Sequence, residues 1–143
     1  MSFELDELYR DVILDHYRSP RGVQPLVRPD VSEEGYNPLC GDEVTLQLCV
    51  ADGRVTDVSV RGRGCSISVA SGSLLAEQLR GKTLGEVREI LAAFKSMLHG
   101  ESAPDERLLG DLAVLEGVKS FPVRIKCALL PWTTLEQALA RIS

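Results

Sequence analysis

The chain has 143 residues, of which 44% are hydrophobic and 26% charged, values that fit one soluble globular domain spanning residues 1–143. The formal net charge of −5 argues against a nucleic-acid partner bound through its phosphates, and the 5% aromatic content argues against a base-stacking surface. There is no apolar run of the roughly 18 residues expected of a membrane span and no secretory-signal layout, so we expect a cytoplasmic protein whose four cysteines stay reduced.

The first periodic segment covers residues 5–17, where apolar residues recur three and four positions apart. This spacing predicts one face of an amphipathic helix. Ser19-Pro20-Arg21-Gly22 should end that helix, because proline and glycine disfavour its continuation. The stretch that follows, with Pro25, Pro29 and Gly35, is expected to be an extended loop.

Two segments, 44–50 and 58–60, then alternate between apolar and polar residues. A period of two predicts half-buried strands, here joined as an antiparallel hairpin. A three-residue loop at 51–53 would pair Val44 with Val60 and keep the apolar side chains on one face. A two-residue turn would set apolar residues opposite polar ones, so we predict the three-residue loop.

Four helical segments follow the hairpin: after Cys65 to Gly81, Thr83 to about Leu98, Asp105 to Leu115, and Pro122 to near Ile142. Thr83 and Glu86 have the spacing of a capping box, and Pro131 is expected to break or kink the last segment. Strands early and helices late predict an α+β domain, with a small antiparallel sheet covered by helices on one side.

Three cysteines and one aspartate form a candidate ligand set: Cys40, Asp42, Cys65 and Cys127. Cys40 and Asp42 are two residues apart before a strand, so their side chains can project to the same side. Cys65 stands at a predicted helix start, where the backbone favours a thiolate. These residue types suit a tetrahedral zinc site. No C-x-x-C pair fixes two ligands locally, however, and the spacing alone also allows separate buried cysteines.

The remaining residues with reactive side chains have other expected roles. Arg124 lies three residues before Cys127, where it can favour the thiolate or be a solvated surface charge. Cys49 falls in the strand phase opposite to the apolar residues and is expected to be structural. His16 should pack or hydrogen-bond within its helix, and His99 should interact with a helix end, so neither is expected to be a ligand.

Four collinear motifs carry a resemblance to a known family: Asn37–Asp42 (Asn-Pro-Leu-Cys-Gly-Asp), Gly64–Ser73, Leu8–Arg21 and Pro122–Cys127. They resemble the corresponding segments of IscU-like proteins (the NifU N-terminal domain family), which serve iron–sulfur cluster assembly. The resemblance covers nearly the whole chain and implies the IscU/SufE-like fold.

Two departures make the chain similar to the SufU-type branch of that family. Lys126 occupies the position where IscU scaffolds have a histidine, and the interval after Cys65 is longer, with the extra residues near 93–111. This resemblance implies that Cys40, Asp42, Cys65 and Cys127 hold zinc. It also implies that Cys40 accepts persulfide sulfur from a pyridoxal-phosphate cysteine desulfurase of the SufS type and delivers it to a SufB-containing scaffold.

The chemistry of transfer leads to further expectations. A thiolate must attack the donor persulfide, and Cys40, on a loop, can swing away from the metal if the desulfurase supplies a replacement ligand. Arg124 would then stabilise the persulfide charge. The insert 93–111 and the first helix are expected either to dock the partner or simply to cover the core.

Two alternatives remain open at this point. The same four residues can hold a [2Fe–2S] cluster in an IscU-type scaffold, or zinc can serve only to stabilise the fold. Whether the chain acts as a sulfurtransferase enzyme is also left open.

Overall fold

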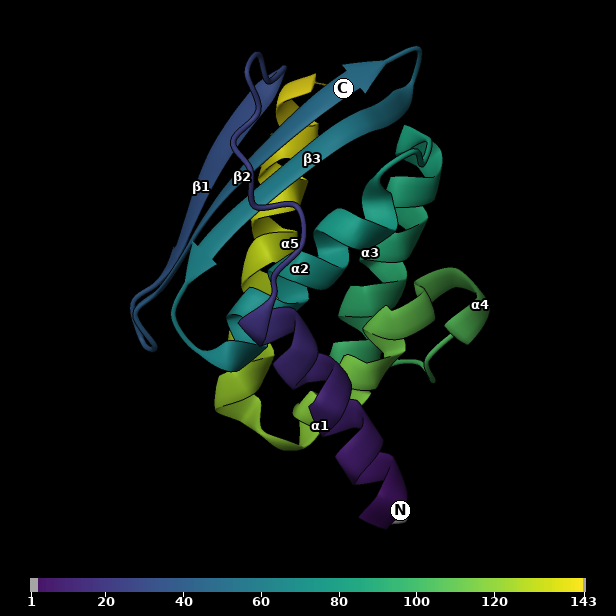
Figure 1. The fold of residues 1–143 in the computed structure, drawn as a ribbon. Coiled ribbons are helices and arrows are strands. Elements are labelled where there is room, and N and C mark those ends of the chain that lie inside the picture. Colours follow the sequence, from purple (N-terminus) through teal and green to yellow (C-terminus); the bar gives the residue numbers. More distant parts are fainter. Residues whose placement is uncertain (1–2, 143) are drawn as a thin grey trace.

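The computed structural model describes residues 3–142, with side chains from residue 10 onward. Its elements are α1 (Phe3–Arg18), β1 (Val31–Asn37), β2 (Asp42–Ala51), β3 (Arg54–Arg63), α2 (Ser66–Leu79), α3 (Leu84–Leu98), α4 (Glu106–Leu109), a 3-10 helix η1 (Gly110–Ser120) and α5 (Pro122–Ile142). Figure 1 shows one three-stranded antiparallel sheet, in the order β1-β2-β3, with the helices on one side. The predicted α+β class is therefore confirmed. Within residues 3–142, no helix is long and apolar enough to cross a membrane.

The prediction of a loop up to Gly35 is wrong, because residues 31–37 form the edge strand β1. This strand pairs antiparallel with β2, with Val31 opposite Leu48. Most of its residues are polar, so the sequence lacks the apolar alternation of a strand. Gly35 is required by packing, since a Cβ there would overlap the hydroxyl of Thr134 on α5. Contacts with α5 and β2, rather than strand propensity, explain β1.

The hairpin forms, but its predicted register is wrong. The turn has two residues, Asp52 and Gly53, with φ angles of 53° and 73°, the left-handed pair that tight hairpins favour. Leu46 pairs with Val60, two residues further along β3 than predicted. A β-bulge leaves Thr56 unpaired and restores the phase that a two-residue turn would otherwise invert.

The first two helices after the sheet match their predicted bounds. The capping box of α3 is present: the Thr83 hydroxyl accepts the Glu86 N–H at 3.1 Å, and the Glu86 carboxylate accepts the Thr83 N–H at 2.9 Å. His99 is the C-terminal cap of the same helix, where it was expected.

One prediction for the later helices is wrong, and one of the two outcomes predicted at Pro131 is excluded. The helix predicted over 105–115 is only α4, one turn long, because Gly110 takes a positive φ of 55° and the chain continues as η1. Pro131 does not break the last segment, since α5 runs from Pro122 to Ile142, and a kink at this position stays a prediction. Proline at this position removes one helical hydrogen bond, and the buried residues on both sides of it, including Trp132, hold the helix together.

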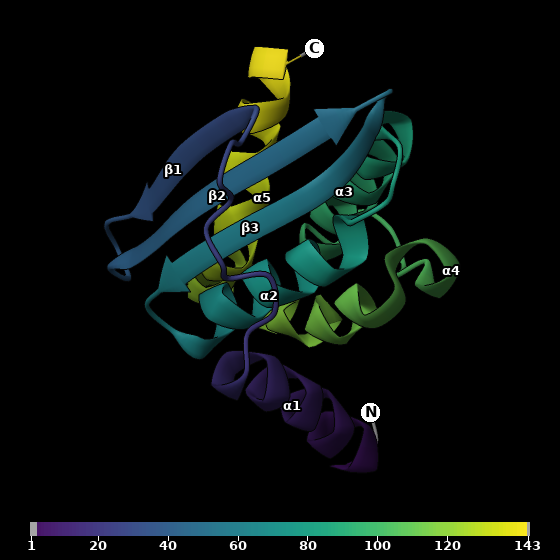
Figure 2. The ribbon, with the colours of Figure 1, turned by 45° about the horizontal axis from the view of Figure 1, so that its top comes forward.

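The core lies between the sheet and helices α2, α3 and α5, as the two ribbon views show (Figures 1 and 2). Phe94 and Trp132 stack at its centre with ring centroids 4.7 Å apart. The indole N–H of Trp132 donates to the Ser71 hydroxyl at 3.0 Å, which donates to the Ala128 carbonyl at 2.6 Å. These bonds fix α2 against α5, the two helices that carry Cys65 and Cys127 at or near their starts.

Helix α1 lies at the edge of the molecule and packs mainly on α2 (Figure 2). Buried His16 joins the two helices through a 2.7 Å hydrogen bond between its Nδ1 and the Ser73 hydroxyl. The expectation that His16 packs is confirmed, but its hydrogen-bond partner lies on α2 and not within its own helix. Three residues of the predicted apolar face, Leu5, Leu8 and Tyr9, lie outside the described side chains.

Candidate metal centre

The four predicted ligands come from three parts of the chain that meet at one end of the sheet. Cys40 lies in the turn between β1 and β2, and Asp42 is the first residue of β2. Cys65 is the N-terminal cap of α2. Cys127 lies in the second turn of α5. The packing of α2 and α5 described above therefore brings the four residues together.

Three of the four predicted ligand atoms are close enough to share a single metal ion, and Cys65 is not part of this group. The ligand atoms of Cys40, Asp42 and Cys127 all lie within 4.8 Å of one another, and the Cys40 and Cys127 sulfurs are 3.1 Å apart. The Cys65 sulfur lies 3.6 Å from Asp42 Oδ2. Tetrahedral zinc with bonds of about 2.3 Å to sulfur and 2.1 Å to oxygen needs sulfur–sulfur spacings of about 3.8 Å and sulfur–oxygen spacings of about 3.6 Å. To hold one ion with all four residues, the Cys40 and Cys127 sulfurs would have to separate and Cys65 would have to move closer to the other ligand atoms.

Asp42 is fully buried and oriented by its neighbours. Its Oδ1 accepts the Cys65 backbone N–H at 2.8 Å, so Oδ2 is the oxygen left for a cation. Gly64 lies against this carboxylate with a φ of 137°, and a Cβ on Gly64 would overlap Asp42 Oδ1. Sequence analysis missed this role of Gly64, although its place directly before Cys65 was a usable signal.

The turn that carries Cys40 is held by its backbone. The Asn37 carbonyl accepts N–H groups from Cys40 at 3.3 Å and from Gly41 at 2.8 Å. Gly41 has a φ of 71°, with open space around it. Cys40 is thus half-buried on a short turn, whereas Cys127 is buried on a helix. Of these two cysteines, Cys40 is the one that can move without disturbing the core.

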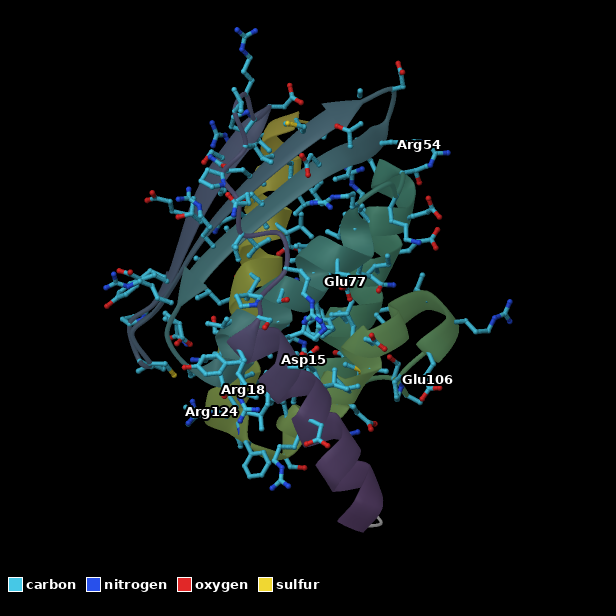
Figure 3. All side chains as sticks on the ribbon, viewed as in Figure 1. Asp15, Arg18, Arg54, Glu77, Glu106 and Arg124 are labelled. Atoms are coloured by element: carbon cyan, nitrogen blue, oxygen red, sulfur yellow. The ribbon has the colours of Figure 1, made fainter. Side chains whose placement is uncertain are left out.

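The electrostatics of the site favour a bound cation. Burial raises the pKa of the Cys127 thiol well above its usual range, and the adjacent Cys40 and Asp42 raise it further. With its pKa raised in this way, Cys127 stays protonated at neutral pH as long as no metal ion is bound. Arg124 lies at the beginning of α5 (Figure 3), and its interactions with Cys127 and Cys65 raise the pKa of its guanidinium.

A shallow pocket of about 500 Å³ opens over Cys40 and Cys65, with Arg124 on its wall. Two large apolar side chains of its rim are exposed, Phe121 by 63% and Val123 by 62%. Exposed apolar groups around a reactive thiol indicate a surface that contacts another molecule.

Cys49 lies outside the site, as expected, and the α4 portion of the insert 93–111, expected to dock the partner or to cover the core, lies far from it. The Cys49 thiol lies on β2 and is directed to the Arg28 carbonyl at 3.5 Å. The insert 93–111 comprises the end of α3, all of α4 and the first residues of η1. Both ribbon views place α4 on the opposite side of the molecule from the starts of α2 and α5 (Figures 1 and 2). Its α4 portion therefore lies far from the thiols.

Comparisons with known proteins agree with the fold. A family model described as the NifU-like N terminal domain matches residues 8–128. The chain is 39% identical to the zinc-dependent sulfurtransferase SufU of Bacillus subtilis, over 99% of this chain and 97% of that protein. It is 40% identical to the iron–sulfur cluster assembly scaffold protein IscU of Thermotoga maritima, over 95% of each.

A solved structure from Fervidobacterium islandicum AW-1, named as a candidate iron–sulfur cluster assembly scaffold protein for the SUF system, superposes with a TM-score of 0.86. It is 39% identical and covers 90% of this chain and 94% of its own. Identity to a sulfurtransferase and to a scaffold protein is nearly equal, so overall similarity does not choose between these two activities.

Proposed function

The chain belongs to the NifU-like N-terminal domain family of iron–sulfur cluster assembly proteins, and from this membership and its site we propose that it is a zinc-dependent sulfur-transfer protein. The observation that carries the proposal is the convergence of the Cys40 and Cys127 thiols and the Asp42 carboxylate within 4.8 Å, with the Cys65 sulfur 3.6 Å from the same carboxylate. The similarity to a zinc-dependent sulfurtransferase supports zinc as the metal. A zinc ion at these four residues would keep their thiols deprotonated at neutral pH.

Cys40 is the proposed sulfur acceptor. Its thiolate attacks the outer sulfur of a donor persulfide, a new sulfur–sulfur bond forms, and the donor's own cysteine leaves as a thiolate. Cys40 becomes the persulfide, and no external oxidant or reductant is needed. Position supports this role: Cys40 lies on a turn beside the open pocket, whereas Cys127 is buried. The exposed guanidinium of Arg124 is placed to stabilise the persulfide anion.

The donor in this proposal is a pyridoxal-phosphate cysteine desulfurase of the SufS type, and the sulfur passes on to a SufB-containing scaffold. The chain would act in the cytoplasm as a sulfurtransferase. Relatives named for sulfur transfer and for the SUF system support these partners.

The second candidate is a scaffold that holds a [2Fe–2S] cluster on the same four residues. Its support is the 40% identity to a protein named as an IscU scaffold. Lys126, where IscU scaffolds have histidine, is exposed beside buried Cys127 and argues against it. Purified protein distinguishes the two: a colourless sample with one zinc supports sulfur transfer, and a brown sample with visible absorption supports the scaffold.

The main experiment compares Cys40→Ser with Cys49→Ser, a control thiol on the same strand pair but outside the site. Each variant is incubated with cysteine and the desulfurase, and bound persulfide is measured by mass spectrometry. We expect Cys40→Ser to accept no sulfur and Cys49→Ser to accept as much as the wild type. Undiminished transfer by Cys40→Ser would refute the role of Cys40 and leave zinc as a stabiliser of the fold.

A further inference from the structure

A second, larger hollow lies beside the metal centre and has no part in holding the metal. We call it the α1–η1 groove. It has a volume of about 650 Å³ and runs between α1, the start of α2, η1 and the start of α5. Its walls are mainly apolar and include Ile13 and Leu14 of α1, Ile67 of α2 and Val114 of η1. These four side chains are half-buried, so the groove leaves apolar surface uncovered.

The charge at the groove has one sign. Arg10 and Arg124 line it, and no carboxylate from the described residues does. Neither guanidinium forms an ion pair with another described side chain, although the chain as a whole carries a net charge of −5. A segment that binds in this groove should therefore carry apolar side chains that pack on the walls and carboxylates that pair with the two arginines.

The groove is continuous with the pocket over the reactive thiols. Both hollows are lined by Ser120, Phe121 and Arg124, and the pocket over the thiols also contains Cys40 and Cys65. A chain segment lying in the groove would thus pass directly to the thiols. A nucleic acid or free phosphate is a poorer occupant, because the walls between the two arginines are apolar.

We propose that the α1–η1 groove binds an apolar, acidic segment of the protein partner that delivers sulfur to Cys40. The inference rests on the proposed function and adds the place where the partner is recognised and the chemistry of the segment recognised. It also replaces the insert 93–111 as the expected docking surface, since α4 lies on the far side of the molecule (Figures 1 and 2).

Gly117 offers a direct way to fill the groove. A Cβ at Gly117 meets no atom within 4 Å, so the indole of a Gly117→Trp variant can occupy the groove without displacing its walls. Gly85→Trp is the matched control, because Gly85 is an exposed glycine near the start of α3 whose Cβ would lie 3.9 Å from its nearest neighbour. Both variants are first checked for zinc content and circular dichroism.

The measurement is desulfurase turnover as a function of the concentration of this chain. We expect Gly117→Trp to raise the half-saturating concentration about tenfold or more, the loss typical of blocking one anchor of an interface, while Gly85→Trp behaves as the wild type. Arg10→Glu is the independent test: it should weaken saturation and reduce its salt dependence, whereas Arg107→Glu on α4 should not.

A low-molecular-weight persulfide, glutathione persulfide, separates this inference from the proposed function. In the zinc-free proteins, Cys40 should take sulfur from it equally in all four variants, because no partner has to dock or to replace Cys40 at the metal. If the wild type takes no sulfur from the desulfurase, the proposed function fails. If the wild type does and both Gly117→Trp and Arg10→Glu match it, only the groove proposal is overturned. It is also overturned if Gly117→Trp changes self-association, which would identify a second copy of the chain as the occupant.

Discussion

Replacing Gly64 with alanine tests whether the carboxylate of Asp42 is positioned by the absence of a side chain at residue 64. An alanine Cβ would overlap Asp42 Oδ1 and lie 2.8 Å from Asp42 Cα. Either the carboxylate or the backbone has to move. Because the same carboxylate accepts the Cys65 N–H at 2.8 Å, the movement would break that hydrogen bond.

Two costs add up at this position. A φ of 137° is unfavourable for a residue with a Cβ and costs about 1–2 kcal/mol. Losing a hydrogen bond to a buried charged group costs about 1.5–3 kcal/mol. We therefore expect Gly64→Ala to lower the free energy of unfolding by about 2.5–5 kcal/mol. Because the displaced oxygen belongs to a proposed ligand, we expect zinc affinity to fall about 10–100-fold.

Gly81→Ala is the matched control. Gly81 also has a positive φ, 86°, but a Cβ there meets nothing within 4 Å, so only the backbone cost applies. Urea denaturation of the metal-free proteins gives the free energy of unfolding, and competition with a chromophoric chelator gives the zinc affinity. The reasoning is refuted if Gly64→Ala loses no more stability than Gly81→Ala and binds zinc as tightly as the wild type.

Three further predictions concern residues away from the metal. Burial, and then the charge of Arg21, lowers the pKa of His16. Since the unfolded chain binds that proton more readily, the free energy of unfolding should fall as the pH drops below about 6.5. Urea denaturation at pH 7.5 and 5.5 should show a smaller fall for His16→Gln than for the wild type, and equal falls would contradict this. Cys49→Ala should retain one zinc per chain by metal analysis, and loss of zinc would place Cys49 in the site. Thr83→Ala removes the capping hydroxyl that accepts the Glu86 N–H and should cost about 1 kcal/mol in the same denaturation assay; no loss of stability would show that the cap adds nothing to α3.

Local patterns predicted the type of most elements but not how they pair. Alternation over 44–50 showed which side chains face the core, yet the bulge at Thr56 preserves that phase while shifting the register by two residues. A period of two cannot reveal a shift of two. Strand β1 was missed for a different reason: its pairing depends on the close approach of α5 at Gly35, a contact between residues distant in sequence.

The candidate ligand set could be proposed from the sequence because the family motifs specify residue types at fixed positions. Spacing alone did not show that Cys127 lies 3.1 Å from Cys40, since 87 residues separate them and their approach depends on the packing of α5. The orientation of Asp42 was equally hidden, because it depends on an absent side chain at Gly64 and a backbone N–H of Cys65. Sequence shows what a site contains, and packing decides which atoms face each other.

The position of α5 has a consequence for synthesis of the chain on the ribosome. This helix packs against β1, β2 and α2, so the apolar face of the sheet stays partly uncovered until α5 has been made. Cys40 and Cys65 emerge well before Cys127, the last of the three thiols. A nascent chain therefore exposes two thiols without their third partner, and we expect metal loading to follow translation of α5 rather than accompany it.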